Sequence, residues 1–447
     1  MRQPGFSYHR FTKGKGTMAQ LHFRQRFLRI LLPGAIACLL NSCVSTGTVP
    51  APEQEQPVSQ EESAGAEESA NDEKAEKTFA DGSPVVTSRT AGSGGDSILL
   101  SFAGDIMAHT PNTARGHYDK IYEDIEPLIR QSRLSFANME TPVDDDKPFS
   151  SYPQFNVHHT YADAAIAAGF NVFSLANNHT NDQGLSGIRA TQKYFAEKEE
   201  KTKWSSRPVY ASGLKDSPQS PFSYRVITDH SWTVLFLAVT EILNQGSYSG
   251  YINYVKSDEA SRNAFIDSVR KLREENPCDL FVLSVHCNEP EYVLSVKKSQ
   301  REFYRKLLDA GVDVLWANHP HVSKEWEVIT DQDNEASKII FYAMGNTISA
   351  QRYKPAFKDP SDTHEYTGDG YIAQVRFQKK REGGVRITWV NPVLITTYIT
   401  TDALFVIRRL DDAFIEELTE EQRRDWATYL EERKKLMEKI EGKTLWQ

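Results

Sequence analysis

The sequence predicts an α/β fold built from mixed sheets. Strand patterns alternate with amphipathic helical patterns from about residue 97 to residue 320, which indicates stacked layers of helix and sheet. Other strand patterns follow one another across short turns, as antiparallel neighbours do. The sheets should therefore contain both parallel and antiparallel strands, and no glycine-rich phosphate loop accompanies them.

Residues 1–43 are predicted to form a signal peptide. The first 50 residues hold seven Lys and Arg and no acidic residue, and the apolar run 30–40 follows Arg29. That run is too short to span a bilayer and is typical of a signal-peptide core. It ends at Leu40-Asn41-Ser42-Cys43, which resembles a bacterial lipobox, so Cys43 is the predicted lipid attachment site. The alternative is an ordinary cleaved signal in which Cys43 is incidental.

Residues 44–96 are predicted to be a disordered acidic linker. The stretch from Ala51 to Ala80 contains nine acidic residues, two lysines and almost no large apolar side chain, a composition that cannot form a core. Such a linker would let a folded domain stand away from a membrane surface. The positive charge of the leader and the negative charge of the linker cancel each other. The formal net charge of −9 therefore lies on the rest of the chain, which disfavours a nucleic-acid partner.

Residues 97–400 are expected to form the folded domain, and residues 401–447 a charged helical extension. Gly169 and Gly311 each follow an Ala-containing turn and precede a Val-rich strand, as C-cap glycines do. A helical run from Asp411 to Gly442 should pack on the surface or face a partner, away from the functional site. The other predicted helices are Tyr122–Gln131, Ala162–Ala168, Gly184–Glu199, Asp258–Glu275 and Ser299–Ala310.

The strands are predicted from apolar and alternating runs. One antiparallel hairpin is expected from Tyr224–Thr228 and Thr233–Val239. A second antiparallel block should comprise Trp326–Thr330, Lys338–Tyr342, Tyr371–Gln378 and Val385–Val390. The apolar runs are Ile98–Ala103, Leu134–Ala137, Val172–Ala176, Leu280–Val285 and Val312–Ala317.

Two cysteines flank one of these strands. Cys278 and Cys287 bracket the run 280–285, and extended chain of that length separates their Cα atoms by roughly 30 Å. A disulfide cannot bridge that distance, so both cysteines should be unpaired.

Each apolar run ends abruptly in a polar cluster. Side chains at the carboxyl ends of strands in open α/β sheets converge on a shared crevice, even when they are far apart in the sequence. We therefore predict that these clusters form one metal site. The clusters are Gly104-Asp105, Asn138-Met139-Glu140, Asn177-Asn178-His179, His286, His319-Pro320-His321 and Gly345-Asn346.

Local sequence refines several of these positions. Asp105, Met107 and His109 would share a face if the first strand continued. Pro142 should end the second strand and leave Glu140 at the rim. Pro320 should hold the backbone extended, with both flanking imidazoles on one face.

Each cluster alone has a structural alternative: a capping residue such as Asn181 or Asp182, a surface acid, a core histidine, or a turn. The joint placement of carboxylates, amides and imidazoles instead favours one or two divalent cations, namely Mn, Fe, Zn or Mg. Two cations about 3.5–4 Å apart, bridged by a carboxylate, would suit phosphoester displacement.

In order along the chain, the motifs GDIM, NME, NNHTNDQG, a strand-end His, HPHV and YAMGN resemble the CapA family of poly-γ-glutamate capsule biosynthesis proteins. The domain of this family is similar to the calcineurin-like metallophosphoesterases. The resemblance spans roughly residues 97 to 350. It implies a four-layer α/β/β/α sandwich of mixed sheets, metallophosphoesterase-like, with the metal site at one sheet edge and an extracytoplasmic location. By the same resemblance the metal ligands are Asp105, Glu140, Asn178, His286, His319 and His321.

The resemblance also implies a catalytic role for His179, at the position of a general acid that protonates the leaving oxygen; Asp182 is grouped with it. The chain departs from the phosphoesterases at Met107, where they carry a histidine, and His109 is a possible substitute. It also lacks a glycine of the family's fourth motif, so either Glu289 or Glu291 could belong to the site. Further accessory candidates are Asn138 and Asn346.

These observations predict a bacterial, extracytoplasmic lipoprotein of capsule or cell-envelope biosynthesis or export. We expect a metal-dependent hydrolase of phosphoesters or of γ-glutamyl polymer, attached to the membrane through its lipid. One alternative is a non-catalytic accessory protein that binds an anionic polymer such as poly-γ-glutamate, or an envelope synthesis or export protein, through the same site. Another is a purely structural role, with the histidines filling the core.

Overall fold

The computed structural model describes residues 96–332 and 335–441. The chain divides into a unit of residues 1–74 and a unit of residues 75–447, and everything described belongs to the second. The predicted signal peptide, Cys43 and residues 44–95 of the predicted linker lie outside the described residues. Within 96–332 and 335–441, no helix has both the length and the apolar character needed to cross a bilayer.

The strands form two mixed sheets. The first is eight-stranded, in the order β14-β13-β12-β1-β2-β3-β4, with β11 pairing beside β1. Its strands β1, β2, β3 and β4 run parallel, whereas β12, β13 and β14 are antiparallel. The strands are β1 (Ser97–Ile106), β2 (Leu134–Met139), β3 (Val172–Ser174), β4 (Tyr210–Ser212), β11 (Asn346–Ile348), β12 (Asp369–Lys379), β13 (Val385–Ile399) and β14 (Phe405–Arg409).

The second sheet is six-stranded, in the order β5-β6-β7-β8-β10-β9. Its central strands run parallel, and the edge strands β5 and β9 pair antiparallel. The strands are β5 (Tyr224–Asp229), β6 (Trp232–Thr240), β7 (Leu280–His286), β8 (Val314–Asn318), β9 (Trp326–Thr330) and β10 (Ala336–Phe341).

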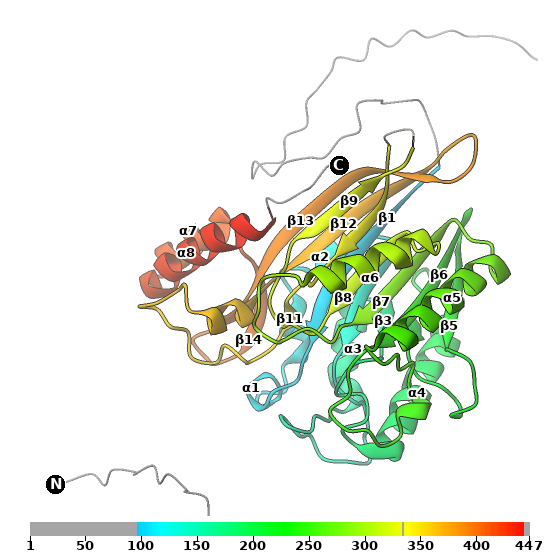
Figure 1. Ribbon diagram of the computed structural model, residues 1–447. Coiled ribbons are helices and arrows are strands. Elements are labelled where there is room, and N and C mark those ends of the chain that lie inside the picture. Colours follow the sequence, from blue (N-terminus) through cyan, green and yellow to red (C-terminus); the bar gives the residue numbers. More distant parts are fainter. Residues whose placement is uncertain (1–95, 333–334, 442–447) are drawn as a thin grey trace, which may run out of the picture. The chain divides into compact units, whose positions relative to one another are not determined.

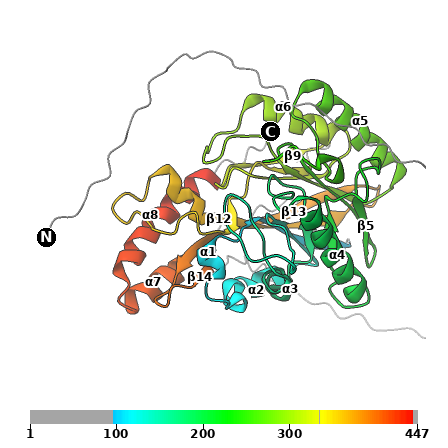
Figure 2. The ribbon, with the colours of Figure 1, turned by 90° about the horizontal axis from the view of Figure 1, so that it is seen from below.

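Helices cover the outer faces of both sheets, which gives the predicted α/β/β/α layering (Figures 1 and 2). The six-stranded sheet packs against α5 and α6 through one apolar cluster. A larger cluster fills the space between the sheets and joins the eight-stranded sheet to α2, α3 and α4. The helices are α1 (Thr110–Thr113), η1 (Tyr118–Tyr122), α2 (Glu126–Arg130), α3 (His159–Ala168), α4 (Gly184–Thr202), η2 (Ser249–Tyr251), α5 (Glu259–Glu275), α6 (Lys298–Asp309), η3 (Thr363–Gly368), α7 (Asp412–Glu420) and α8 (Arg424–Glu441).

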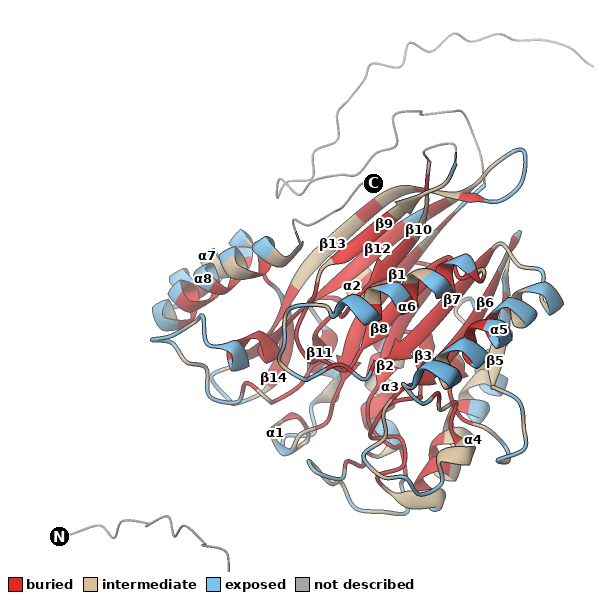
Figure 3. Ribbon diagram, viewed as in Figure 1, coloured by how far each residue is buried: buried red, intermediate tan, exposed pale blue. Residues whose placement is uncertain are grey.

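The two sheets are buried against each other along their central strands (Figure 3). The Trp316 indole on β8 donates a hydrogen bond to the Ala103 carbonyl on β1, 2.9 Å away, and so joins one sheet to the other. Closer to the carboxyl ends of the strands than this hydrogen bond, β1 and β2 of one sheet meet β7 and β8 of the other. Their carboxyl ends meet because the parallel strands of both sheets run in the same direction. The site described below lies at this edge.

Three details differ from the sequence-based expectation. The predicted second antiparallel block is split: β9 and β10 pair in the six-stranded sheet, whereas β12 and β13 pair in the eight-stranded sheet. The helix expected over 122–131 is shorter, with η1 before it and α2 starting at Glu126-Pro127. The expected helical extension 401–447 begins with strand β14, which pairs with β13 inside the sheet. Long-range strand pairing decides the first and third features, which local patterns do not show. The helix is shorter because Pro127 is favourable only in the first turn, where α2 begins.

Among the described residues, Cys278 and Cys287 are both free thiols, as predicted.

Candidate metal centre

The eight-stranded sheet supplies the acidic side of the candidate site. Asp105 lies near the end of β1, opposite Asn138 of the parallel strand β2, and Glu140 follows β2 directly. Asn138 Nδ2 donates to Asp105 Oδ1 across 2.8 Å. Asp105, Asn138 and Glu140 are all buried. Neighbouring parallel strands thus place two carboxylates inside the protein at one sheet edge.

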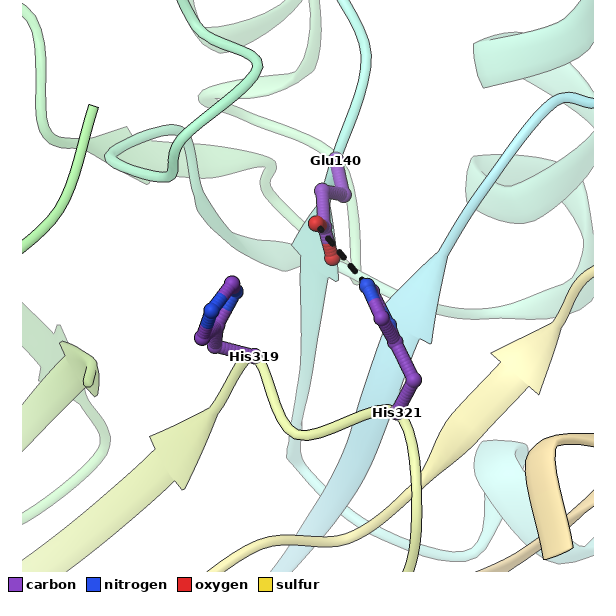
Figure 4. A group of neighbouring side chains, drawn as sticks. All are labelled: Glu140, His319 and His321. Carbon is purple, nitrogen blue, oxygen red and sulfur yellow. Dashed lines mark ion pairs between the residues drawn. The ribbon is translucent and has the colours of Figure 1, made fainter. Parts of the chain in front are cut away.

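The six-stranded sheet supplies the imidazoles. His286 is the last residue of β7, and His319 and His321 lie in the turn that follows β8. The ring centroids of His286 and His319 are 4.9 Å apart, and those of His319 and His321 are 5.9 Å apart. The expectation of an extended backbone around Pro320 is wrong, because His319 and His321 have φ values of 105° and 56°. This left-handed turn brings both rings toward Glu140 (Figure 4).

Glu140 belongs to two buried groups that could each hold a metal ion. One consists of Glu140, His319 and His321, and the other of Asp105, Glu140 and His286; the ligand atoms within each group lie within 4.8 Å of one another. Glu140 Oε1 is 3.6 Å from His286 Nε2 and 3.7 Å from His321 Nε2. One carboxylate therefore stands between the two groups.

The chemistry of these residues fits a divalent cation. Within the part of the chain that the structure describes, both Glu140 oxygens and His319 Nδ1 are buried without a hydrogen-bond partner. Burial, followed by the nearby Asp105 carboxylate, raises the pKa of Glu140 well above its usual range. A nearby positive charge would stabilise the ionised form of a buried carboxylate beside a second one, and a cation between these groups would supply it.

Two of the imidazoles are held in the neutral form that binds metals. Burial and then the neighbouring His319 lower the pKa of His286 well below its ordinary value. Burial and then His321 lower the pKa of His319 to about 3. Burial also opposes protonation of His321, but the Asp105 carboxylate, with Nδ1 at 3.3 Å from Oδ2, outweighs it and raises the pKa of His321.

Amide side chains orient the imidazoles. Asn346 donates its amide hydrogens to oxygens of the loop around it, at 2.8 Å from the Thr367 carbonyl and 3.0 Å from Ser349 Oγ. Its Oδ1 therefore accepts from His321 Nδ1, 3.0 Å away, which leaves Nε2 for a ligand role. Asn178 Oδ1 lies 2.7 Å from His286 Nε2, so the predicted ligand Asn178 is placed against the second group.

His179 and Asp182 form a buried pair beside these groups. His179 Nδ1 lies 2.7 Å from Asp182 Oδ2, and the same oxygen accepts from the Phe155 backbone N–H at 2.8 Å. The Phe155 ring lies edge-on to the His179 ring at 4.6 Å. An imidazole held this way by a carboxylate through Nδ1 presents Nε2 for proton transfer.

The sequence motifs did not identify Asn244, whose Nδ2 lies 3.2 Å from His179 Nδ1. Asn244 belongs to a loop that packs onto Asn178 through two further contacts: its backbone N–H donates to the Asn178 carbonyl, and Asn178 Nδ2 donates to Asn244 Oδ1. No local signal marks this residue, because the contact depends on the fold.

The accessory candidates separate into different roles. The strand β1 ends at Ile106, so Met107 and His109 do not continue on its face. His109 Nδ1 accepts from the Ala350 N–H at 3.3 Å, and His109 belongs to neither of the two groups that could hold a metal ion. Glu289 is occupied elsewhere, in a buried ion pair with Lys324 at 2.5 Å. Glu291 is exposed. Its charge adds to the effect of burial and of Asp105 in raising the pKa of Glu140 and, against burial, to the effect of Asp105 in raising the pKa of His321.

Tyr292 is a second residue that the motifs did not single out as functional. Its φ is 62°, and its N–H donates to the Pro320 carbonyl at 2.9 Å. Its ring centroid lies 6.4 Å from that of His321, and Gln351 Nε2 donates to its hydroxyl at 3.3 Å. The left-handed backbone thus docks Tyr292 on the turn that carries two of the imidazoles.

The sequence was compared with protein families and known proteins. The model of the family described as "Bacterial capsule synthesis protein PGA_cap" matches residues 99–351. The PGA biosynthesis protein CapA of Bacillus subtilis is 25% identical over 303 residues, which is 66% of this chain and 72% of that protein. The capsule biosynthesis protein CapA of Bacillus anthracis is 26% identical over 267 residues, which is 57% of this chain and 61% of that protein.

Two solved structures are similar at low identity. A putative 5'-nucleotidase from Staphylococcus aureus in complex with α-ketoglutarate has a TM-score of 0.39 and 11% identity, covering 66% of this chain and 54% of the other. The calcineurin-like phosphoesterase YfkN from Bacillus subtilis has a TM-score of 0.36 and 9% identity, covering 75% of this chain and 100% of the other.

Proposed function

Because this chain belongs to the bacterial capsule synthesis protein family PGA_cap, we propose that it acts in capsule or cell-envelope biosynthesis or export as a metal-dependent hydrolase. The substrate we propose is a phosphoester or a γ-glutamyl polymer. The observation that carries the proposal is Glu140, a buried carboxylate without a hydrogen-bond partner that is shared by two groups of potential metal ligands. The names of two relatives, a PGA biosynthesis protein and a capsule biosynthesis protein, support an anionic polymer as the substrate.

The proposed cation ligands come from both sheets. Asp105, Glu140, His286, His319 and His321 would hold the cation, which would act as a Lewis acid on the scissile group. Asn178 lies against the same groups, as a further oxygen donor.

The His179 and Asp182 pair provides acid catalysis. Asp182 accepts a hydrogen bond from Nδ1–H and fixes the orientation of the ring. It also stabilises the imidazolium form, which carries a second proton on Nε2 and transfers that proton to the leaving oxygen. The Phe155 ring covers one side of this imidazole and limits its exposure to water.

The test uses purified protein loaded with Mn²⁺, assayed on a generic phosphodiester and on poly-γ-glutamate. His179→Ala should lower kcat by about 10²–10⁴-fold without changing metal content, whereas His321→Ala should lose metal. His159→Ala is the matched control, because His159 forms a similar pair with Asp145 at 2.6 Å that is about half exposed and outside the site. Stoichiometric metal without turnover of either substrate would refute the hydrolase.

That outcome would favour the second candidate, a non-catalytic accessory protein that binds an anionic polymer or an envelope protein through the same site. Met107 supports this alternative, because a thioether occupies a position where the phosphoesterases that the family resembles carry an imidazole. Among the described residues Met107 is buried, and its carbonyl accepts from the Tyr161 hydroxyl at 2.6 Å.

The location we propose is extracytoplasmic, with the protein anchored to the membrane by a lipid on Cys43. The lipobox-like sequence before Cys43 and the acidic segment after it support this location. Mass spectrometry of the mature N-terminus is the test, with a diacylated Cys43 as the expected result. A mature N-terminus at another residue would refute the anchor.

A further inference from the structure

Asn318 carries a buried amide that forms no hydrogen bond with any other residue of 96–332 and 335–441. It is the last residue of β8 and is 1% exposed, and neither its Nδ2 nor its Oδ1 has a partner. Burying an amide without a hydrogen bond costs free energy, and such groups in native proteins usually have a ligand or a functional reason. The backbone carbonyl of Asn318 by contrast accepts a hydrogen bond from the Cys287 N–H at 3.1 Å.

The strand geometry shows where this amide points. Side chains two residues apart on a strand share a face, so Asn318 faces the same way as Trp316. Trp316 reaches across to the Ala103 carbonyl of the other sheet, whereas Leu315 and Ala317 pack in the cluster under α5 and α6. Asn318 therefore points between the sheets, one repeat nearer the carboxyl end than Trp316.

The place between the sheets toward which the Asn318 side chain points is the candidate metal centre. Asn318 pairs in register with His286 of the parallel strand β7, and registered residues project from the same face. On the opposite sheet, Asp105 lies two residues beyond Ala103 and accepts a long contact of 3.4 Å from the backbone N–H of His319, the residue after Asn318. Asn318 thus faces the group formed by Asp105, Glu140 and His286.

We propose that Asn318 is a further residue of the metal centre, with its Oδ1 contributing a neutral oxygen to the bound cation. Amide oxygens are ordinary ligands for Mg²⁺ and Mn²⁺, and two carboxylates already attract the cation to this place. The inference rests on the metal site of the proposed function but not on hydrolysis. It assigns a residue that lies one position before the His-Pro-His motif and outside every motif that the sequence offered.

The experiment is calorimetric titration of the chelator-treated full chain with Mn²⁺ alone. Asn318→Leu, similar in volume but without the oxygen, should weaken Mn²⁺ binding by about 10–100-fold. Asn318→Asp keeps an oxygen at the same place and should bind Mn²⁺ at least as tightly as the wild type. Ser284→Ala is the matched control, because Ser284 Oγ is also buried and unpartnered on the same face, in register with Trp316 and away from the site. Its Mn²⁺ affinity should be unchanged.

A merely structural Asn318 gives a different result. Replacing an unpaired buried amide with Leu would then raise the melting temperature of the chelator-treated protein and leave the Mn²⁺ affinity unchanged, which would overturn the inference. If Asn318→Leu does not fold, as judged by near-UV circular dichroism, the smaller Asn318→Ala repeats the titration with the same two outcomes. Failure of the wild type to bind Mn²⁺ would overturn the metal site itself. Retained binding in the folded variants would overturn only the role of Asn318.

Discussion

Arg433→Met should destabilise the folded domain by disconnecting helix α8 from the eight-stranded sheet. Arg433 Nε lies 2.6 Å from Asp369 Oδ2, and Arg352 Nη1 lies 2.7 Å from Asp369 Oδ1. The three side chains are at most 1% exposed. Arg433 also donates to the Pro360 carbonyl at 2.6 Å and covers the Tyr366 ring at 4.0 Å. One buried carboxylate at the start of β12 thus joins two arginines from separate parts of the chain.

The magnitude follows from what the substitution leaves behind. Removing one partner of a buried ion pair costs about 3–5 kcal/mol. Asp369 keeps Arg352, so its charge stays paired, and a Met side chain retains much of the apolar stem of Arg433. We therefore expect the lower end, about 3 kcal/mol. For a domain of roughly 350 residues, an unfolding entropy of about 0.7 kcal/mol/K converts this loss to a melting temperature lower by about 4 °C.

Thermal and urea unfolding of the metal-free protein measure this loss. Lys435→Met is the matched control on the same helix, because Lys435 is 52% exposed and its ion pairs among the described residues are with Glu431 and Glu432. Exposed ion pairs contribute little to stability, so the control should shift the melting temperature by no more than about 1 °C. If Arg433→Met melts within about 1 °C of the wild type, the buried cluster does not anchor α8 and the reasoning is wrong.

Three further predictions concern other buried charges. The pKa of Asp369 lies below its ordinary value of 3.8, because its two arginine partners outweigh burial. The ionised carboxylate therefore stabilises the folded protein fully above pH 3.8, and this stabilisation is lost as the pH falls through the lowered pKa. The unfolding free energies of wild type and Asp369→Asn, measured in urea from about pH 6 to 2.5, should therefore converge at the acid end. Lys324→Met should lower the unfolding free energy by about 3–5 kcal/mol, because it leaves the buried Glu289 without its ion-pair partner. In urea unfolding, the double variant Lys324→Met/Glu289→Gln should recover part of this loss. An unchanged urea midpoint for Lys324→Met alone would contradict the prediction. Glu140→Gln should abolish Mn²⁺ binding in titration. It should also raise the stability of the chelator-treated protein at neutral pH by about 1–3 kcal/mol, because it removes a buried carboxyl group whose ionisation is opposed by burial and by Asp105. A lower melting temperature would contradict this.

The layered fold and the position of the site followed from sequence patterns. Parallel strands end at a common edge, so abrupt changes from apolar to polar residues at Asp105, Asn178 and His286 locate that edge without knowledge of strand order. Sheet membership could not be predicted in this way. The strands β9, β10, β12 and β13 all alternate in the same manner, and only their long-range register separates them between two sheets.

Local backbone geometry also limited the prediction of site residues. A proline favours extended chain locally, yet His319 and His321 adopt left-handed conformations around Pro320 because the turn is held by its contacts. Among these is the bond from the Tyr292 N–H to the Pro320 carbonyl. The sequence also left open whether Glu289 or Glu291 belongs to the site. The structure pairs Glu289 with Lys324, a residue distant in sequence and buried beside it, and local sequence does not show this pairing.

The division of ligand types between the two sheets suits a cation held between them. The carboxyl groups of Asp105 and Glu140 come from the eight-stranded sheet, and the three imidazoles come from the six-stranded sheet and the turn after it. Burial keeps His286 and His319 neutral, as metal ligands must be, and burial together with Asp105 opposes the ionisation of Glu140. A cation shared across this edge would neutralise the acidic side and bind the imidazole side at once. It would thus join the same two sheets that Trp316 connects one repeat deeper in the core.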